Sequence, residues 1–237
     1  MRVNILETLD GARRATGLVV VVDVFRACST AYWASAAGAD LVVVPDQDRA
    51  AELKRSHPDW LFMGDGPASS LDIGYSPTLL EQKDISGQTV ALVGGSGPQG
   101  LYAASEGDTL LLGAFVNAQA MIRYILNSEA SEVTLVAMGS RGQVRSPEDT
   151  MCAMYIKNGV EDYPNSFEVL CNHFRSIPAA QCFFDAARTD APEQDFDRCL
   201  DLDRFPFVLE ARQDNAGIIR LIPIVPEWVE TTHGGAA

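Results

Sequence analysis

Residues 18–22 are five apolar side chains in succession, four of them valine, and this run most constrains the fold of the chain. Such a run is typical of a strand that is buried on both faces of a parallel sheet. The residues after a strand of this kind lie at its carboxyl end, where open α/β sheets bind their ligands. We therefore expect a ligand site directly after residue 22.

Four polar side chains follow the run within eight residues: Asp23, Arg26, Ser29 and Thr30. A carboxylate suits a divalent cation, whereas a guanidinium and hydroxyls suit a phosphate or another anion. The alternative is a plain strand end, at which one of these residues caps the next helix. Because a cap explains one polar residue and not four, the pattern favours a site for a metal ion and an anion.

The composition excludes several classes of partner. A formal net charge of -14 over 237 residues argues against nucleic acid and anionic membranes, since both repel an acidic surface. An anionic substrate is compatible with this charge where arginines or a bound cation gather locally. The sequence contains no transmembrane span and no apolar signal core at its start, which predicts a cytoplasmic protein.

Cysteine and histidine do not have the spacing of a metal centre. The five cysteines are odd in number and widely separated, which predicts reduced thiols packed as small apolar side chains. His57, His173 and His233 are scattered, so a histidine-based metal site or catalytic triad is not expected.

Strand-like and helix-like segments alternate along the chain, which predicts a three-layer α/β/α fold with a mostly parallel or mixed sheet. We expect one domain over residues 1–237, with two related subdomains divided near residue 130 as the alternative. Strands are predicted at residues 2–6, 18–23, 41–44, 61–63, 89–93, 109–112 and 133–137. Helices are predicted at residues 29–37, 46–57, 99–105, 116–127, 147–158, 165–175, 177–188 and 195–202.

Two segments interrupt this alternation. Residues 207–212 and 217–223 predict a hairpin at an edge of the sheet or in a small second subdomain. Residues 64–77 are rich in glycine, serine and proline and predict a long loop, which inside a compact domain is usually functional or disordered.

Residues 95–100 have the GxGxxG spacing of a dinucleotide-binding turn, after a predicted strand and before a helix. That function requires an acidic residue about 20 positions further on, at the end of the next strand, and none is present there. Pro98 also removes an N–H donor. The segment therefore favours a smaller anion pocket at Gly95, Ser96 and Gly97, or a plain tight turn, over a dinucleotide-dependent oxidoreductase.

Cys182 and Arg188 have the Cys-x5-Arg spacing of cysteine-dependent phosphatases. That chemistry requires a loop whose backbone amides surround the phosphate and lower the pKa of the thiol. The residues between them contain no glycine and predict a helix, so we interpret the match as a coincidence.

Glu148 and Asp149 open a predicted helix, where acidic residues are favoured by the helix dipole. The strand before this helix is expected to end at the same edge of the sheet as Asp23 and Arg26. The two carboxylates therefore also suit a site for a hard cation, and Arg141 suits an anion contact. The capping and functional interpretations are compatible with each other.

Four segments, taken in order, carry a resemblance to a known family. Residues 23–30, 71–77, 113–118 and 148–153 are similar to the motifs D-V-x-R-A-T-S-T, G-F-D-L-G-N-S-P, G-S-F-V-N-A and E-D-x-x-C-A. Along roughly its whole length the chain thus resembles the 2-phosphosulfolactate phosphatase (ComB) family. The resemblance implies a magnesium-dependent enzyme of coenzyme M synthesis that hydrolyses a phosphate ester of a small anionic hydroxy acid, 2-phosphosulfolactate or a similar compound.

The resemblance implies roles for two groups of residues. A homodimer is a separate expectation. The catalytic residues would be Asp23, Arg26, Glu148 and Asp149, with Mg2+ on the three carboxylates and water or Asp23 as the attacking group. The substrate-binding residues would be Ser29, Thr30, Gly95, Ser96, Gly97, Asn117 and Arg141.

The chain departs from the family in loops that are expected to contact the substrate. The family's G-G-E-R segment is M-G-D-G at residues 63–66, and its T-T-N-G-T loop is G-S-G-P at residues 95–98. Cys28 replaces a threonine. The identity of the ester is therefore open, and a non-catalytic relative that binds phosphate or a sulfonate is the alternative.

Overall fold

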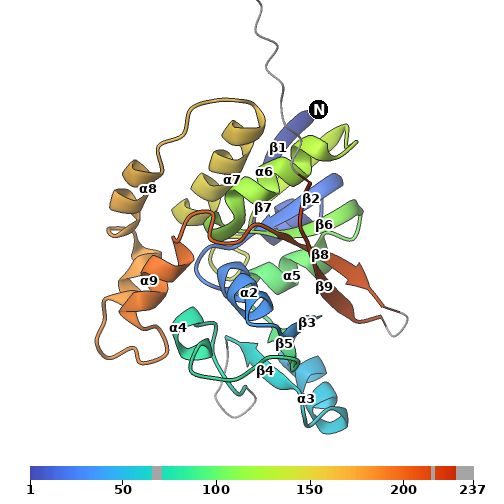
Figure 1. Ribbon diagram of the computed structural model, residues 1–237, viewed down its shortest axis with the longest axis vertical. Helices are drawn as coiled ribbons and strands as arrows, with labels where there is room; N and C mark the ends of the chain where they lie inside the picture. The colour runs from blue at the N-terminus through green and yellow to red at the C-terminus, as the bar shows by residue number, and fades with distance from the viewer. Residues whose placement is uncertain (66–70, 215–216, 228–237) are drawn as a thin grey trace, which may run out of the picture.

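One nine-stranded sheet runs through the computed structural model, which describes residues 1–65, 71–214 and 217–227. Its strand order is β1-β7-β2-β6-β8-β9-β3-β5-β4 (Figure 1). The strands are β1 (Arg2–Glu7), β2 (Gly17–Val22), β3 (Asp40–Val44), β4 (Leu61–Gly64), β5 (Thr89–Val93), β6 (Gly107–Gly113), β7 (Glu132–Ala137), β8 (Val208–Gln213) and β9 (Ile219–Ile224). The helices are α1 (Thr8–Ala12), α2 (Ala27–Ala36), α3 (Gln47–Ser56), α4 (Pro77–Leu80), α5 (Ser96–Ala103), η1 (Phe115–Asn117), α6 (Ala118–Asn127), α7 (Pro147–Val160), α8 (Phe167–Phe174), η2 (Pro178–Phe183) and α9 (Glu193–Cys199).

The valine run forms the buried strand that it predicts. Val19 and Val21 of β2 belong to the core on one face of the sheet, and Val20 and Val22 belong to the core on the other. This division follows from the alternation of side chains along a strand. Because β2 pairs in parallel with both β6 and β7, its carboxyl end lies inside the sheet, and Asp23 follows directly.

The sheet consists of two parallel sets of strands that run in opposite directions. One set is β1-β7-β2-β6 and the other is β3-β5-β4. Between them, β8 and β9 are antiparallel to each other and to the strands that flank them, β6 and β3. The sheet is therefore mixed, as predicted.

Helices cover both faces of this sheet in the predicted three-layer arrangement. A shared core joins one face of both sets to α1, α2 and α5, and it includes Val21 and Leu92. On the opposite face, α6 and α7 cover the first set, while α3 covers the second through Ala50 and Leu53 (Figure 1). The division into subdomains near residue 130 stays a prediction.

The hairpin of β8 and β9 lies in the middle of the sheet, so the prediction of an edge position or a second subdomain is wrong. Leu209 and Leu221 project from it into the shared core. The turn between two strands indicates that they pair with each other, but it carries no information about their outer neighbours. In the structure, β8 pairs with β6, where Leu110 lies opposite Ala211. On the other side, β9 pairs with β3, where Leu41 lies opposite Leu221.

The helices differ from the predictions at several places, and α1 has no counterpart among the predicted helices. The predicted helix 177–188 is the short η2 followed by turns, and the helix predicted at 99–105 begins earlier, at Ser96. Residues 66–70 of the predicted loop, residues 215–216 of the hairpin turn and His233 lie outside the described residues. None of the helices in the described ranges has the length and apolar character needed to cross a membrane.

Tyr32 links α2 to both sides of the β6–β8 junction. Its hydroxyl donates to the Leu112 carbonyl at 2.6 Å and accepts from Asn117 Nδ2 at 2.7 Å and from the Leu209 amide at 3.1 Å. Asn117 Oδ1 in turn accepts from the Ala114 amide at 3.0 Å, and both side chains are fully buried. The predicted substrate contact of Asn117 is therefore not supported, because its amide group joins structural elements in the core.

Replacing Tyr32 by phenylalanine is expected to destabilise the protein by about 2 kcal/mol or more, because the Leu209 and Asn117 donors and the Leu112 acceptor lose a buried partner. Y102F is the matched control, since the Tyr102 hydroxyl is only half-buried and donates to the Val43 carbonyl at 2.9 Å. The control is expected to lose about 1 kcal/mol. Urea unfolding measures both values, and equal losses would contradict the role given to Tyr32.

Candidate active site

A cavity of about 980 Å³ opens where strands of both parallel sets end. Asp23 after β2 and Gly139 after β7 line it from one set, while Asp65 after β4 and Gly95 after β5 line it from the other. Its remaining wall includes Arg26, Arg141, Glu148 and Asp149, and also Ala179, Cys182, Arg188 and Asp190 from the chain after α8. The cavity thus gathers segments from much of the sequence around two kinds of charge.

Asp149 joins the ends of two strands. Its Oδ1 accepts from the Val24 amide at 2.7 Å, and its Oδ2 accepts from the Gly139 amide at 2.8 Å. The sequence places Asp149 in the first turn of α7, so the start of this helix is bound to the carboxyl ends of β2 and β7. This confirms the prediction that Asp149 and Asp23 share an edge of the sheet.

Asp23 is bound from the opposite set of strands. Its Oδ2 accepts from the Gly97 amide at 2.8 Å, at the start of α5. A Cβ atom at Gly97 would lie 2.8 Å from Cys28 Sγ, so glycine lets this amide come close. The contact explains how two sets of strands that run in opposite directions contribute to one cavity.

Glu148 is the buried carboxylate that lacks a full set of partners. Its side chain is nearly inaccessible, and Oε2 has no hydrogen-bond partner among the described residues. Burial raises the pKa of Glu148, and burial together with the charges of neighbouring carboxylates raises the pKa of Asp23 to about 7. Burial and the nearby Asp23 and Glu148 also raise the pKa of Asp149. Three buried carboxyl groups are therefore crowded in one part of the cavity.

This donor set fits a magnesium ion held by two carboxylates. No group of three or more acidic, cysteine or histidine side chains in the described part of the chain is arranged to hold a metal. Mg2+, however, is usually bound by one or two carboxylates together with waters and substrate phosphates. Asp23 and Glu148 fit that pattern because Glu148 Oε2 is unpartnered, whereas both Asp149 oxygens accept backbone amides.

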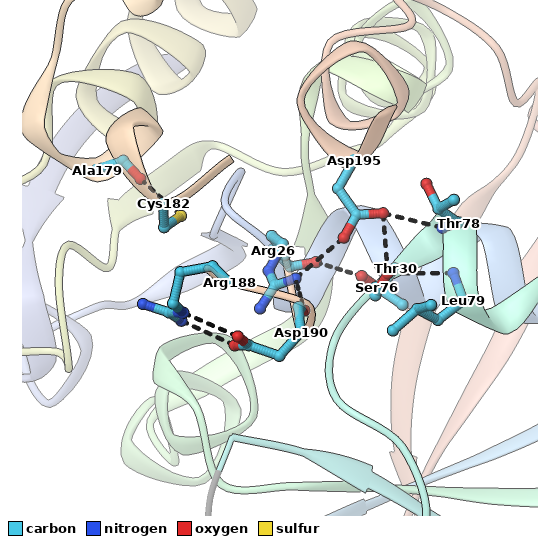
Figure 2. A network of polar contacts seen from close by, with 10 residues as sticks. All are labelled: Arg26, Thr30, Ser76, Thr78, Leu79, Ala179, Cys182, Arg188, Asp190 and Asp195. Atoms are coloured by element: carbon cyan, nitrogen blue, oxygen red, sulfur yellow. Dashed lines mark hydrogen bonds and ion pairs between the residues drawn. The ribbon is translucent and has the colours of Figure 1, made fainter. Parts of the chain in front are cut away.

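Arg26 is held at the cavity by two contacts from the carboxyl-terminal part of the chain. Its Nη1 donates to the Asp190 carbonyl at 2.7 Å and to Asp195 Oδ2 at 3.0 Å (Figure 2). The Arg26 side chain is 10% exposed and that of Asp195 is 0% exposed. Arg26 thus lines the cavity as predicted, but its partners are residues that the sequence does not single out.

Ser29 and Thr30 do not line the cavity. Ser29 Oγ donates to the Val24 carbonyl, and Thr30 Oγ1 donates to the Arg26 carbonyl, both at 2.8 Å. Both residues are fully buried in the first turn of α2. Their predicted substrate contacts are not supported, because the hydroxyls satisfy backbone carbonyls of the loop that carries Asp23.

The polar groups of the glycine-rich turn at residues 95–97 also form hydrogen bonds within the protein. Ser96 Oγ donates to the Gly139 carbonyl at 2.8 Å and accepts from the Gly142 amide at 3.1 Å, while the Gly97 amide is bound to Asp23. Gly95 and Ser96 line the cavity, but Gly97 does not, so the predicted three-residue anion pocket is not formed. Arg141 lines the cavity, and none of the described residues forms an ion pair with it.

Cys182 and Arg188 both line the cavity, although the helix predicted between them is absent. The Cys182 thiol donates to the Ala179 carbonyl at 3.3 Å (Figure 2). Burial raises the pKa of Cys182 although Arg26 and Arg188 oppose this, so the thiol is protonated at neutral pH. A protonated thiol agrees with our interpretation that the Cys-x5-Arg spacing is a coincidence.

The fold and the cavity define a class of α/β protein, one that gathers buried carboxylates and arginines where its strands end. The model of the family described as 2-phosphosulpholactate phosphatase matches residues 4–214. The chain therefore belongs to the 2-phosphosulpholactate phosphatase family.

Several curated relatives share this description. A "Probable 2-phosphosulfolactate phosphatase" of Caldicellulosiruptor saccharolyticus is 31% identical over 157 residues, which are 62% of this chain and 64% of the relative. One of Trichormus variabilis is 29% identical over 147 residues, or 60% of either chain. One of Carboxydothermus hydrogenoformans is 29% identical over 216 residues, which are 88% of this chain and 85% of the relative. The matches to the first two span less than two thirds of those relatives.

Without divalent cations, the stability of the protein is expected to fall by about 3 kcal/mol between about pH 5 and about pH 8. The pKa of Asp23 is about 7 in the folded state against a usual value of 3.8, so the folded state binds the proton more tightly. This contribution is complete below the unfolded pKa and is lost as the pH rises through the folded pKa. Urea unfolding in chelator measures it, and a flat or rising stability would contradict the assignment.

The variant D23N is expected to have a shallower pH dependence, because an amide does not titrate. D72N is the matched control on the cavity wall. Burial raises the pKa of Asp72, but hydrogen bonds from Lys54 and the Phe62 amide outweigh it and lower the pKa. Asp72 therefore titrates below this pH window, and D72N is expected to keep the slope of the unmodified protein.

Proposed function

We propose that the protein is a magnesium-dependent phosphatase that hydrolyses the phosphate ester of a small anionic hydroxy acid, 2-phosphosulfolactate or a similar compound. The observation that carries the proposal is the buried, unpartnered Glu148 Oε2 in the same cavity as Asp23 and Arg26. Membership of the family supports the reaction class. A cytoplasmic location and a homodimer are further proposals that the sequence alone suggests.

Asp23 and Glu148 would hold the magnesium ion, because both line the cavity and Glu148 Oε2 is unpartnered among the described residues. When bound, Mg2+ supplies Lewis-acid neutralisation of phosphoryl oxygens and lowers the pKa of water. The Gly97 amide fixes Asp23 from the side of α5, and Asp149 fixes the strand end from which Asp23 projects. The carboxylates are thus oriented before any ligand binds.

Arg26 would bind the phosphoryl oxygens and stabilise the charge that they carry in the transition state. Its Nη1 is used by Asp190 and Asp195, which leaves Nε and Nη2 as donors for a ligand. Phe25 closes the wall behind it, 5.1 Å from the Phe183 ring and 5.7 Å from the Phe196 ring. An aromatic wall excludes water and thereby strengthens the electrostatic contacts of the arginine.

A second anionic group of the substrate would be neutralised by Arg141. Arg188 lines the same cavity, but its Nε and Nη2 are bound to the Asp190 carboxylate at 2.8 Å each. Arg141 makes no ion pair with a described residue, so it is the more available cation for a carboxylate or sulfonate. The Gly97 amide is bound to Asp23, which weakens the predicted anion pocket at the glycine-rich turn and also the dinucleotide alternative.

The variant E148Q is expected to lower kcat/KM for ester hydrolysis about 100-fold, because the glutamine keeps the shape of the side chain and removes the metal-binding charge. Phosphate release from phosphosulfolactate and other phosphorylated hydroxy acids, with and without Mg2+, measures this loss. E161Q is the matched control, since Glu161 is exposed at the opposite end of α7, and it is expected to stay within about 2-fold of the unmodified protein.

Release of phosphate from no ester by the folded protein would contradict the proposed activity. Binding of phosphate or sulfolactate without turnover would then support the non-catalytic alternative. Hydrolysis that is unaffected by chelator would retain the phosphatase and contradict the role of magnesium.

A further inference from the structure

We infer that Asp195 is a positioning residue that fixes the Arg26 guanidinium in the cavity, so that its free edge faces a bound phosphoryl group. The inference rests on the proposed function for the role of Arg26. It concerns a residue that lies 169 positions further along the chain and does not itself line the cavity. Three observations carry it.

The first observation is the burial of the ion pair. Asp195 is 0% exposed and Arg26 is 10% exposed, and Asp195 Oδ2 lies 3.0 Å from Arg26 Nη1. Removing one partner of such a pair leaves a buried charge unbalanced, which is strongly unfavourable. Separating Arg26 from Asp195 would therefore cost considerable free energy, so the position of the guanidinium depends on that of the carboxylate.

The second observation is that Asp195 is itself fixed. Its Oδ1 accepts from Ser76 Oγ at 2.9 Å and from the Thr78 amide at 2.9 Å, at the start of α4 (Figure 2). Ser76 Oγ also accepts from the Leu79 amide at 3.1 Å as the cap of that helix. The carboxylate is therefore held by groups on α4 while it holds Arg26, and it has little freedom to rotate.

The third observation concerns which nitrogens of the Arg26 guanidinium are bound and which remain free. Arg26 Nη1 donates to Asp195 and also to the Asp190 carbonyl at 2.7 Å, so its two hydrogens are both used. The Arg26 guanidinium lies 5.9 Å from the centre of the Phe183 ring. With one corner bound and one face against an aromatic ring, Nε and Nη2 are the donors that remain. A planar guanidinium held in this way is prepared for two parallel hydrogen bonds to a phosphate.

A purely structural role for Asp195, as a link between α9 and α4, predicts a different result from a positioning role. The variant D195N keeps an oxygen that can accept from Ser76 and Thr78, but it removes the charge and turns an NH2 group toward Arg26. It therefore leaves the link to α4 largely in place and disturbs the arginine. D197N is the matched control, because Asp197 lies on the same helix with an exposed side chain paired to Arg175.

The test is a double-mutant cycle of D195N and R26A, read by kcat/KM for ester hydrolysis and by the Kd of inorganic phosphate in the presence of Mg2+. D195N is expected to lower kcat/KM about 100-fold and to weaken phosphate binding, since a misplaced catalytic group costs about that factor. In the R26A background, D195N is expected to change either quantity by less than about 3-fold. D197N is expected to match the unmodified protein in both.

Two results would overturn the inference. One is a D195N variant whose kcat/KM and phosphate Kd equal those of the unmodified protein. The other is a D195N substitution that changes these quantities by the same factor with and without Arg26. The phosphate titration separates this outcome from a failure of the proposed function. A protein that hydrolyses no ester but binds phosphate with the expected cycle keeps the positioning role and loses the phosphatase. If D195N does not fold, S76A replaces it, and the loss of one hydrogen bond to Asp195 is expected to weaken phosphate binding about 3-fold only when Arg26 is present.

Discussion

The carboxylate of Asp149 is the contact on which the site depends. By accepting the amides of Val24 and Gly139 at 2.7 and 2.8 Å, it binds the ends of two strands to the first turn of α7. That turn also carries Glu148, so the same contact brings Glu148 to Asp23. Charge crowding follows directly, because three carboxyl groups are buried in one place. Such crowding of buried carboxyl groups is electrostatically unfavourable and raises their pKa values.

The second requirement is that two oppositely directed sets of strands share one cavity. The hairpin of β8 and β9 joins the sets by antiparallel pairing, and α5 crosses from the end of β5 to Asp23. One set thereby supplies the carboxylates, whereas the chain after α8 supplies the partners of Arg26. Asp23 and Arg26 consequently lie in one short segment, whereas the groups that hold Arg26 come from a part of the chain that is distant in sequence.

Local patterns predicted much of this structure. The strands could be predicted from the sequence because a buried strand in a parallel sheet must be apolar on both faces, as the valines of β2 are. The position of the hairpin in the sheet could not be predicted, because the residues of a turn indicate which two strands pair and not where the pair lies in the sheet. Ser29, Thr30 and Asn117 are polar residues next to strand ends, but a sequence does not state whether a hydroxyl or amide faces a ligand or a backbone carbonyl. Asp195 had no local signal, since it is one acidic residue among several in α9.

The sequence by itself determined the α/β class, the strand that ends at Asp23 and the paired acidic residues at the start of α7, because these depend on apolar runs and on helix-start chemistry that act over a few residues. Only the tertiary structure decided which polar groups remain free for a ligand. That outcome depends on hydrogen bonds between distant segments, such as Gly97 with Asp23 and Asp195 with Arg26. A buried polar group must find a partner wherever the fold offers one, and the partner's place in the chain does not enter into that requirement.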